Sequence, residues 1–398
     1  MQVKPEAGAS PGPLSNVRVI EIGFAVAGPM AATLMADFGA DVVKVELPGQ
    51  GDGMRSMGPK EQGVGIWWLV AARNKKSITV NLKTEEGKTI LRGLLAEADV
   101  LVENFRPGVM ESLGFDWDTL RALNPRLVML RVSGFGQTGP YSHRPGFGKI
   151  AEAVAGATNL TGHAHEPPLH PGYSLGDVVC ALMGAYGVML ALHSRQQSGK
   201  GQVVDLALYE PLFRLIEWQL PLHTITKTPI HRDGPRFPFA DAFMTNICPT
   251  RDGDHVVVSA ATLPHLERLA GLLRDHGIEG DLSGTSALSE GTRQYIQAND
   301  AQTVINTFLQ HELVAGLVYT PADMLEDEHM KARGNIVNMP HPMFGQVPMP
   351  SVVPALGETP GSIRWIGPDL GQHTEEILRD RLGYDQERVA ALRAAGVL

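Results

Sequence analysis

Strand-like and helix-like segments alternate over the first 135 residues, and this alternation constrains the fold more than any other feature of the chain. The segment "NVRVIEIG" (16–23) is rich in β-branched residues, as strands are, and "GPMAATLMADFGA" (28–40) has the apolar spacing of a helix. Strands separated by helices of this length predict an α/β fold with a parallel sheet and right-handed crossovers. The pattern continues with the strand-like "DVVKVEL" (41–47), "SITVNL" (77–82), "DVLVEN" (99–104) and "RLVMLRVSG" (126–134), and with the helical "TEEGKTILRGLLAEA" (84–98), which Thr84 is expected to cap.

Four glycine- or proline-rich segments follow the predicted strands at their carboxyl ends, where open α/β sheets bind ligands. Glycine allows backbone amides to approach a ligand closely, so these loops are the expected place for a site. Each nearby basic residue is explained on its own as a solvated surface charge, but together they favour a phosphorylated ligand. The loops are "GFAVAGP" (23–29), "PGQGDGMR" (48–55), "NFRPG" (104–108) and "SGFGQTGPY" (133–141), and the basic residues are Arg55, Arg73, Lys75, Lys76, Arg106 and Arg144.

The composition of the 398-residue chain, 43% hydrophobic and 19% charged, is that of a globular protein with two or three domains. A net charge of -9 argues against binding to nucleic acid or to an anionic membrane, so metabolites are the expected partners. Residues 1–15 contain no signal-peptide core, and the apolar run Val178 to Leu192 is too short to span a bilayer. These features predict a cytoplasmic protein with an apolar helix in its interior.

Metal binding and disulfides are not indicated. Cys180 and Cys248 are too few for a disulfide framework and form no metal-ligand pair. The histidines of "TGHAHEPPLH" (161–170) have no regular spacing, which favours a polar loop over a metal site.

A second region begins after Leu222. "AFMTNICPTRDGDHVVVSA" (242–260) predicts two strands joined at an Asp-Gly turn, and "LPHLERLAGLLRDHG" (263–277) predicts a helix with proline near its start. We therefore expect a smaller α+β domain at 225–325. Closer to the C-terminus, "HTEEILRDRLG" (373–383) predicts a further helix.

One acidic residue, Asp177, stands at the head of the apolar stretch "SLGDVVCALMGAYGVMLAL" (174–192). Its carboxylate either caps a helix or does chemistry. In the first turn it would meet unpaired backbone amides and the positive end of the helix dipole, which should keep it ionised, as a nucleophile must be. Gly176 beside it leaves room for a substrate, and the residues alone leave the choice between the two roles open.

A set of motifs spread over nearly the whole chain resembles the class III coenzyme A transferases, the CaiB/BaiF superfamily of formyl-CoA and carnitine CoA-transferases, which also contains α-methylacyl-CoA racemase. The resemblance implies a Rossmann-like large domain built from both chain ends, a smaller domain, and a homodimer of two interlocked chains. It predicts a flexible tail at 1–15, a large CoA-binding domain at 16–224, the small domain at 225–325, and a segment at 326–398 that returns to the large domain. The motifs are "GPMAATLMADFGADVVKVELPGQGD", "NKKSITVNLKTEEG", "VENFRPG", "SGFGQTGPY", "RPGF", "LGD" before the apolar helix, "SGKGQVVDLALYE" and "DLGQHTEEIL".

The resemblance also implies a site. Asp177 matches the catalytic aspartate of the family, and CoA thioesters are implied as substrates, with no tightly bound cofactor and no metal. The chain has Ser112 where formyl-CoA transferase has an arginine, and it lacks that enzyme's run of glycines, so formyl and oxalyl substrates are not assigned. The residues that match CoA-binding positions are Val26, Ala27, Lys75, Lys76, Asn104, Phe105 and Arg106, with Arg55 and Arg144 as weaker matches.

Transfer is favoured over racemisation because the racemase keeps a His-Asp pair where this chain has Phe147 and Gly148, neither of which can accept a proton. We therefore expect CoA transfer from an acyl-CoA donor to a small carboxylic acid through a covalent aspartyl intermediate. Histidines and arginines in 163–170 and 231–236 favour a succinate-like dicarboxylate as the acid. The alternatives are intramolecular CoA transfer within one dicarboxylic acyl-CoA, a racemase-type enzyme, and a CoA-binding protein in which Asp177 only caps its helix.

Overall fold

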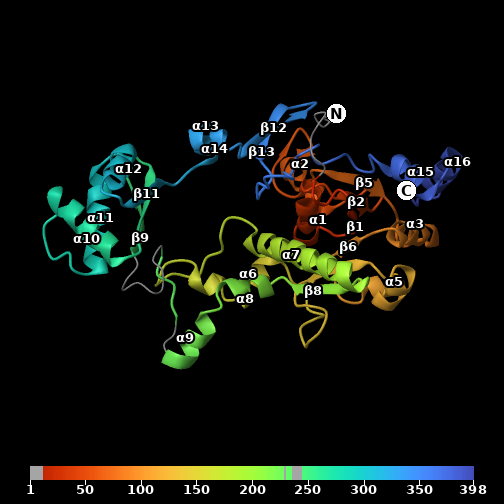
Figure 1. The fold of residues 1–398 in the computed structure, drawn as a ribbon, viewed down its shortest axis with the longest axis horizontal. Helices are drawn as coiled ribbons and strands as arrows, with labels where there is room; N and C mark the ends of the chain where they lie inside the picture. The colour runs from red at the N-terminus through yellow and green to blue at the C-terminus, as the bar shows by residue number, and fades with distance from the viewer. Residues whose placement is uncertain (1–11, 228–229, 235–243) are drawn as a thin grey trace. The chain divides into compact units, whose positions relative to one another are not determined.

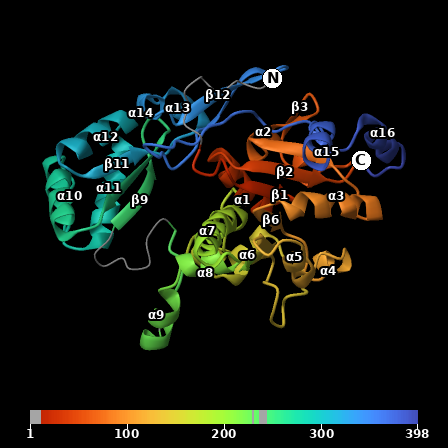
Figure 2. The ribbon, with the colours of Figure 1, turned by 45° about the vertical axis from the view of Figure 1, so that its right-hand side comes forward.

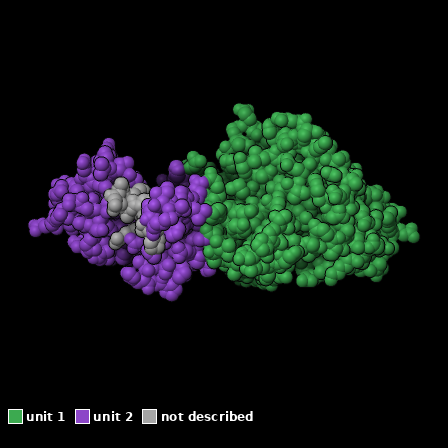
Figure 3. Space-filling model, turned by 90° about the horizontal axis from the view of Figure 1, so that it is seen from below, with its two compact units in different colours: residues 1–155, 173–215, 332–398 green, residues 156–172, 216–331 purple. Residues whose placement is uncertain are grey.

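The computed structural model describes residues 12–227, 230–234 and 244–398 (Figures 1 and 2). The chain divides into two compact units, which Figure 3 colours green and purple. Unit 1 comprises residues 1–155, 173–215 and 332–398, and unit 2 comprises residues 156–172 and 216–331. Each unit is described by itself below, and the domain boundaries expected from the sequence stay a prediction.

Unit 1 is built on a six-stranded sheet in which every neighbouring pair is parallel, so the predicted parallel α/β fold is confirmed. Most residues of its inner strands are buried on both faces, which explains their runs of valine, isoleucine and leucine. In spatial order the strands are β5 (Lys75–Thr79), β2 (Asp41–Glu46), β1 (Arg18–Glu21), β6 (Val100–Glu103), β7 (Val128–Ser133) and β8 (Val203–Ala207).

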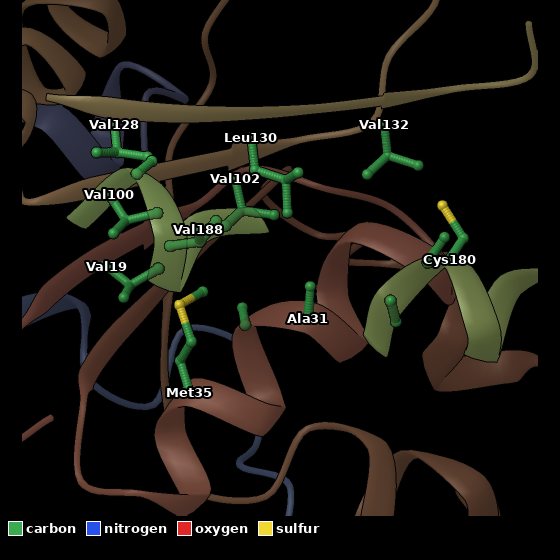
Figure 4. Close-up of a cluster of buried hydrophobic side chains, with 14 of the residues drawn as sticks. Val19, Ala31, Met35, Val100, Val102, Val128, Leu130, Val132, Cys180 and Val188 are labelled. Atoms are coloured by element: carbon green, nitrogen blue, oxygen red, sulfur yellow. The ribbon is translucent and has the colours of Figure 1, made fainter. Parts of the chain in front are cut away.

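Helices cover both faces of the sheet. On one face, α1 (Ala27–Asp37) lies along α7 (Leu175–Ser198), and the two pack on alternate strand residues such as Val19, Val102 and Leu130 (Figure 4). The intervening residues, among them Ile20 and Leu101, point to the other face and pack with the remaining helices of the layer. Those helices are α3 (Glu85–Ala96), α5 (Trp117–Leu123), α15 (Thr374–Leu382) and α16 (Gln386–Ala394).

The four loops expected at a ligand site do follow the carboxyl ends of β1, β2, β6 and β7. The helix predicted at 84–98 is α3, and the Thr84 hydroxyl accepts a hydrogen bond from the Gly87 amide at 3.0 Å, as an N-cap should. The C-terminal segment packs along β5, where the Trp365 indole donates to the Lys75 carbonyl at 2.8 Å and the His373 amide donates to the Ser77 carbonyl at 2.9 Å.

Unit 2 contains a three-stranded antiparallel sheet in the order β11 (Val314–Leu317), β10 (His255–Ala260), β9 (Met244–Pro249). The predicted hairpin is therefore confirmed from residue 244 onwards, while residues 242–243 lie outside the described part of the chain. Gly253 turns it with a φ of 96°. The sheet packs against α10 (Leu263–Asp275), which was predicted at 263–277, and against α11 (Thr285–Ala298) and α12 (Ala301–Gln310).

The remaining elements are short. Those of unit 1 are η1 (Gly53–Ser56), β3 (Lys60–Glu61), β4 (Val64–Gly65), α2 (Ile66–Ala71), α4 (Val109–Ser112), α6 (Gly148–Val154), α8 (Glu210–Leu215), β12 (Ile336–His341) and β13 (Gly345–Pro350). Those of unit 2 are η2 (Thr158–Leu160), α9 (Gln219–Thr226), α13 (Pro321–Glu326) and α14 (Glu328–Ala332). The last residue of α14, Ala332, is the first residue of the third segment of unit 1.

The apolar helix α7 is less enclosed than its sequence predicts. Cys180 and Val188 are fully buried, but Leu182, Tyr186 and Leu190 are 51%, 59% and 52% exposed in the single chain. These three follow each other at four-residue spacing and form one stripe. The helix is long and apolar enough to cross a membrane by length and composition, a test that core helices of soluble proteins also pass. The expectation of an interior helix is therefore wrong for this face, because α1 and the sheet cover only the other side.

Candidate active site

The amino end of α7 presses against α6, and two glycines make this approach possible. A Cβ atom on Gly148 would lie 2.4 Å from Oδ2 of Asp177, and one on Gly176 would lie 2.6 Å from the Gly148 carbonyl oxygen. Larger residues at either position would therefore move the carboxylate or separate the helices. The two glycines place Asp177, the third residue of α7, directly beside the start of α6.

The carboxylate that caps α7 is Glu152, not Asp177. The Ser174 side chain makes no capping hydrogen bond, whereas Oε1 of the fully buried Glu152, on α6, accepts one from the Gly176 amide at 3.1 Å. Lys149 Nζ donates to both Glu152 oxygens at 3.1 Å and to the Tyr173 carbonyl at 2.7 Å. No hydrogen bond to the Asp177 carboxylate occurs within the described residues, so this side chain is free of a capping role.

The positive end of the helix dipole is expected to favour the ionised form of Asp177, but burial and a neighbouring negative charge outweigh this effect on its pKa. Burial, and then the negative charge of Glu152, raise the pKa of Asp177 from its ordinary value of 3.8 to about 6, while the Lys149 ammonium opposes this shift. The carboxylate is still mainly ionised at neutral pH. It is also more basic than an exposed aspartate, which strengthens it as a nucleophile.

The loop before α1 is fixed by two residues from the loops that follow the neighbouring strands β6 and β2. The Phe24 amide donates to Asn104 Oδ1 and the Asn104 side-chain amide donates to the Phe24 carbonyl, each at 2.7 Å. Asp52 Oδ1 accepts from the Ala25 amide at 2.9 Å, which holds Ala25 at a φ of 62°. Val26 and Ala27 follow directly and are buried at the start of α1.

A buried charge network lies under this loop. Lys44 Nζ lies 2.6 Å from Glu21 and 2.7 Å from Asp52, and Lys75 Nζ lies 2.8 Å from Glu21 and donates to the Pro29 carbonyl at 2.7 Å. Burial alone would lower the pKa of Lys44, but the nearby carboxylates raise it, so this ammonium stays charged. Lys75 is 1% exposed and its ammonium supports the loop from inside, so it reaches a ligand only by breaking these contacts.

The other basic candidates divide into paired and exposed groups. Arg55 is bonded to Glu46 and stacks on Trp68 at 3.8 Å, and Lys76 lies at the amino end of β5, 3.6 Å from Asp41 and 3.4 Å from Glu376. Arg106 is exposed beside the half-buried Phe105 at the carboxyl end of β6. Arg144 is exposed and stacks on the Tyr141 ring at 3.6 Å. Arg106 and Arg144 are thus the candidate cations that can meet a ligand without losing an internal ion pair.

A mostly apolar cavity of about 390 Å³ opens between α1, α2 and α7. Val26 and Met30 of α1, Trp68 of α2, and Val178 and Leu182 of α7 contribute to its walls. Lys44, Asp52 and Lys75 of the charge network also line it. Val178, the residue after Asp177, lines the cavity, whereas Asp177 is not among its lining residues; the mostly apolar walls suit an extended apolar chain.

Sequence reasoning missed Lys149, Glu152 and the Lys44 network. Two sequence features could have indicated them. Lys44 is a charged residue inside the strand-like run "DVVKVEL", and Lys149 and Glu152 lie three residues apart just after Phe147 and Gly148. In unit 2, Arg232 donates to the carbonyls of His163 and Glu166, so it fixes the histidine loop of its own unit. Arg236, in the other segment expected to bind the acid, lies outside the described residues. The described part of the chain contains no group of three or more residues suited to a metal ion.

Known proteins resemble the chain over almost its full length. The model of CoA-transferase family III matches residues 14–374. The succinyl-CoA--D-citramalate CoA-transferase of Chloroflexus aurantiacus is 41% identical over 401 residues, 98% of each chain. The succinyl-CoA--L-malate CoA-transferase beta subunit of the same organism is also 41% identical, over 97% of this chain and 98% of the relative. The crystal structure of a CAIB/BAIF family protein from Brucella suis superposes with a TM-score of 0.83 at 28% identity, covering 94% of this chain and all of that one.

Proposed function

The chain belongs to CoA-transferase family III, and from this premise we propose that it transfers CoA from succinyl-CoA to a small dicarboxylic acid, with Asp177 as the nucleophile. The observation that carries the proposal is the position of Asp177, which packs against Gly148, caps no helix among the described residues, and directly precedes Val178 in the wall of an apolar cavity. The donor and the class of acid are supported by the names of the two Chloroflexus relatives, which act on citramalate and malate.

In the proposed reaction the ionised Asp177 attacks the carbonyl carbon of the donor thioester. The C–S bond breaks, CoA leaves as a thiolate, and a mixed anhydride links Asp177 to the donor acyl group. The thiolate attacks the Asp177 carbonyl of this anhydride, which gives an aspartyl-CoA thioester and releases the donor acid. The acceptor carboxylate then attacks the carbonyl carbon of the aspartyl-CoA thioester, which expels CoA thiolate and forms a second mixed anhydride. The thiolate attacks the acceptor carbonyl of this anhydride, which gives the new acyl-CoA and frees the Asp177 carboxylate.

The loops supply the remaining requirements of this chemistry. Exposed Arg106 and Arg144 are suited to the CoA phosphates, and Asn104 fixes the loop that precedes α1 through its two bonds to Phe24. Phe105 follows directly and is half buried. Backbone amides at the start of α1, near Ala27 and Gly28, are suited to the developing oxyanions. Val26 and Trp68 offer apolar contacts for the pantetheine arm in the cavity. Arg55 and Lys75 support these loops through their internal ion pairs, whereas Lys76 pairs with Asp41 and Glu376 at the amino ends of the strands, away from these loops.

We expect labelled free acid to enter acyl-CoA when the enzyme is incubated with succinyl-CoA and a panel of acids. Dicarboxylic acids should react at least about 10-fold faster than monocarboxylic acids of equal length, because the relatives act on dicarboxylates. Mass spectrometry of the CoA products measures the rate with each acid, and running the reaction in heavy water also reports any exchange of the proton at the α-carbon. Failure of every free acid to exchange would point to intramolecular transfer, and deuterium at the α-carbon would point to a racemase.

We also propose a cytoplasmic homodimer in which the exposed stripe of α7 is covered by the second copy. Leu182, Tyr186 and Leu190 form an exposed apolar stripe, the kind of surface that a contact between protein copies covers. Replacing Leu182 and Leu190 by lysine should convert the dimer to a monomer in light-scattering measurements. The matched control is Leu309→Lys on α12, which is 59% exposed and should leave the assembly unchanged. A monomeric unmodified protein would contradict the proposal.

A further inference from the structure

Two charged side chains of α6 hold the start of α7 on either side of Asp177. Lys149 bonds to the Tyr173 carbonyl at 2.7 Å, before the helix, and Glu152 bonds to the Gly176 amide at 3.1 Å, within its first turn. The two are joined to each other at 3.1 Å. They therefore tie the segment that carries Asp177 to α6 through two hydrogen bonds, and the ion pair between them links these two bonds.

The ion pair of Lys149 and Glu152 is unusual because its carboxylate is buried and its ammonium group is partly exposed. Glu152 is fully buried, whereas the Lys149 side chain is 43% exposed. A buried carboxylate is unfavourable unless it is paired and hydrogen-bonded, so Glu152 depends on both the Lys149 ammonium and the Gly176 amide. An apolar residue could fill the position of Glu152 at lower cost, which makes a structural role alone a weak explanation.

We propose that Lys149 and Glu152 are positioning residues for CoA transfer, which hold Asp177 against Gly148 and set the charge around its carboxylate. This inference rests on the proposed function, in which Asp177 is the nucleophile. The negative charge of Glu152 makes the Asp177 carboxylate more basic, and the Lys149 ammonium opposes this effect. Neither residue forms a bond to substrate in this role.

Charges from the other packed elements do not duplicate this arrangement. α1 has no charged side chain before Asp37 in its last turn. On α7 itself the next ionisable group is Cys180, whose pKa is raised by burial and then by Asp177 and by Glu210 of α8, so the thiol stays neutral. Lys149 and Glu152 are the two side chains whose charges act on the pKa of Asp177 within the described residues.

The test compares the pH dependence of kcat/KM in Glu152→Gln and Lys149→Met. Removing the negative charge should move the acid limb of the profile to lower pH, and removing the positive charge should move it to higher pH, each by about 0.5 to 1 unit. Lys149→Arg keeps the charge and should keep the limb. The double variant should return the limb towards that of the unmodified enzyme, because both charges are absent.

A matched control removes the same two charges at the same spacing elsewhere. Glu85 and Lys88 form an i,i+3 ion pair at 2.7 Å on α3, and Glu85→Gln and Lys88→Met should leave the acid limb unchanged. If Glu152→Gln fails to fold, Lys149→Met and Lys149→Arg still give the test, because Lys149 is half exposed. A loss of rate at all pH values, with no movement of the acid limb, would overturn the proposed positioning role of Lys149 and Glu152 and leave only a structural role. Full activity of Asp177→Asn would instead overturn the proposed function.

Discussion

Asp177→Asn should lower kcat for CoA exchange by at least about 10⁴-fold while leaving acyl-CoA binding intact. The amide has the size of the carboxylate but cannot attack a thioester, so the whole covalent route is lost. Steady-state kinetics give the rate, and calorimetric titration with succinyl-CoA gives the affinity. Asp116→Asn, at the exposed N-cap of α5, is the control and should keep full activity. Undiminished exchange by the Asp177 variant would show that the carboxylate is no nucleophile.

The same variant should be more stable than the unmodified protein at pH 7. Burial and Glu152 raise the pKa of Asp177 to about 6, above its ordinary 3.8, so ionisation of this group is less favourable in the folded chain than in the unfolded chain. The resulting destabilisation is complete above pH 6 and disappears as the pH falls towards 3.8. Removing it should increase the free energy of unfolding by about 2 to 3 kcal/mol at pH 7 and by only about 0.5 kcal/mol at pH 4. Thermal unfolding at both pH values measures the difference.

Gly148→Ala should lower kcat by about 10²-fold or more without loss of stability. The new Cβ would lie 2.4 Å from Asp177 Oδ2, so the carboxylate must turn away from its position. Stability is kept because alanine has a better helix propensity than the glycine it replaces in α6. Thermal unfolding and single-turnover kinetics separate the two effects.

Two other glycines serve as references for this substitution. Gly271→Ala, in the middle of α10, meets nothing within 4 Å, so it should leave the rate unchanged and increase stability by about 0.5 to 1 kcal/mol through its helix propensity. Gly176→Ala would meet the Gly148 carbonyl at 2.6 Å, so we expect it to lose stability as well as activity. If Gly148→Ala retained its full rate, the orientation of Asp177 against α6 would have no role in catalysis.

Much of the fold could be predicted because its signals are local. The alternation of β-branched strands and amphipathic helices gave the parallel sheet, Thr84 marked the start of α3, and the Asp252-Gly253 pair marked the hairpin of unit 2. Each of these depends on residues a few positions apart, whose spacing along the chain is their spacing in the element. The loops at the carboxyl ends of the strands followed from the sheet topology in the same way.

The local arrangement of the site could be predicted only in part. A single acid before an apolar helix identified Asp177, and its family match made it a candidate nucleophile, but the direction of its pKa shift was not foreseen. That shift comes first from burial and then from the charge of Glu152, which lies 24 residues before Gly176 in sequence and bonds to its amide from α6. Lys75 shows the same limit, since its sequence neighbours do not reveal that Glu21, 54 residues away, holds its ammonium inside the sheet.

The sequence by itself therefore determined the α/β class, the family and the residue on which the chemistry is proposed to centre. Only the tertiary structure decided that Glu152 caps α7 and leaves Asp177 free, that Lys75 is an internal support, and that one side of α7 is exposed. The physical reason is that periodicity and capping act between residues near each other in the chain. Burial and charge, in contrast, depend on which distant segments the fold brings into contact.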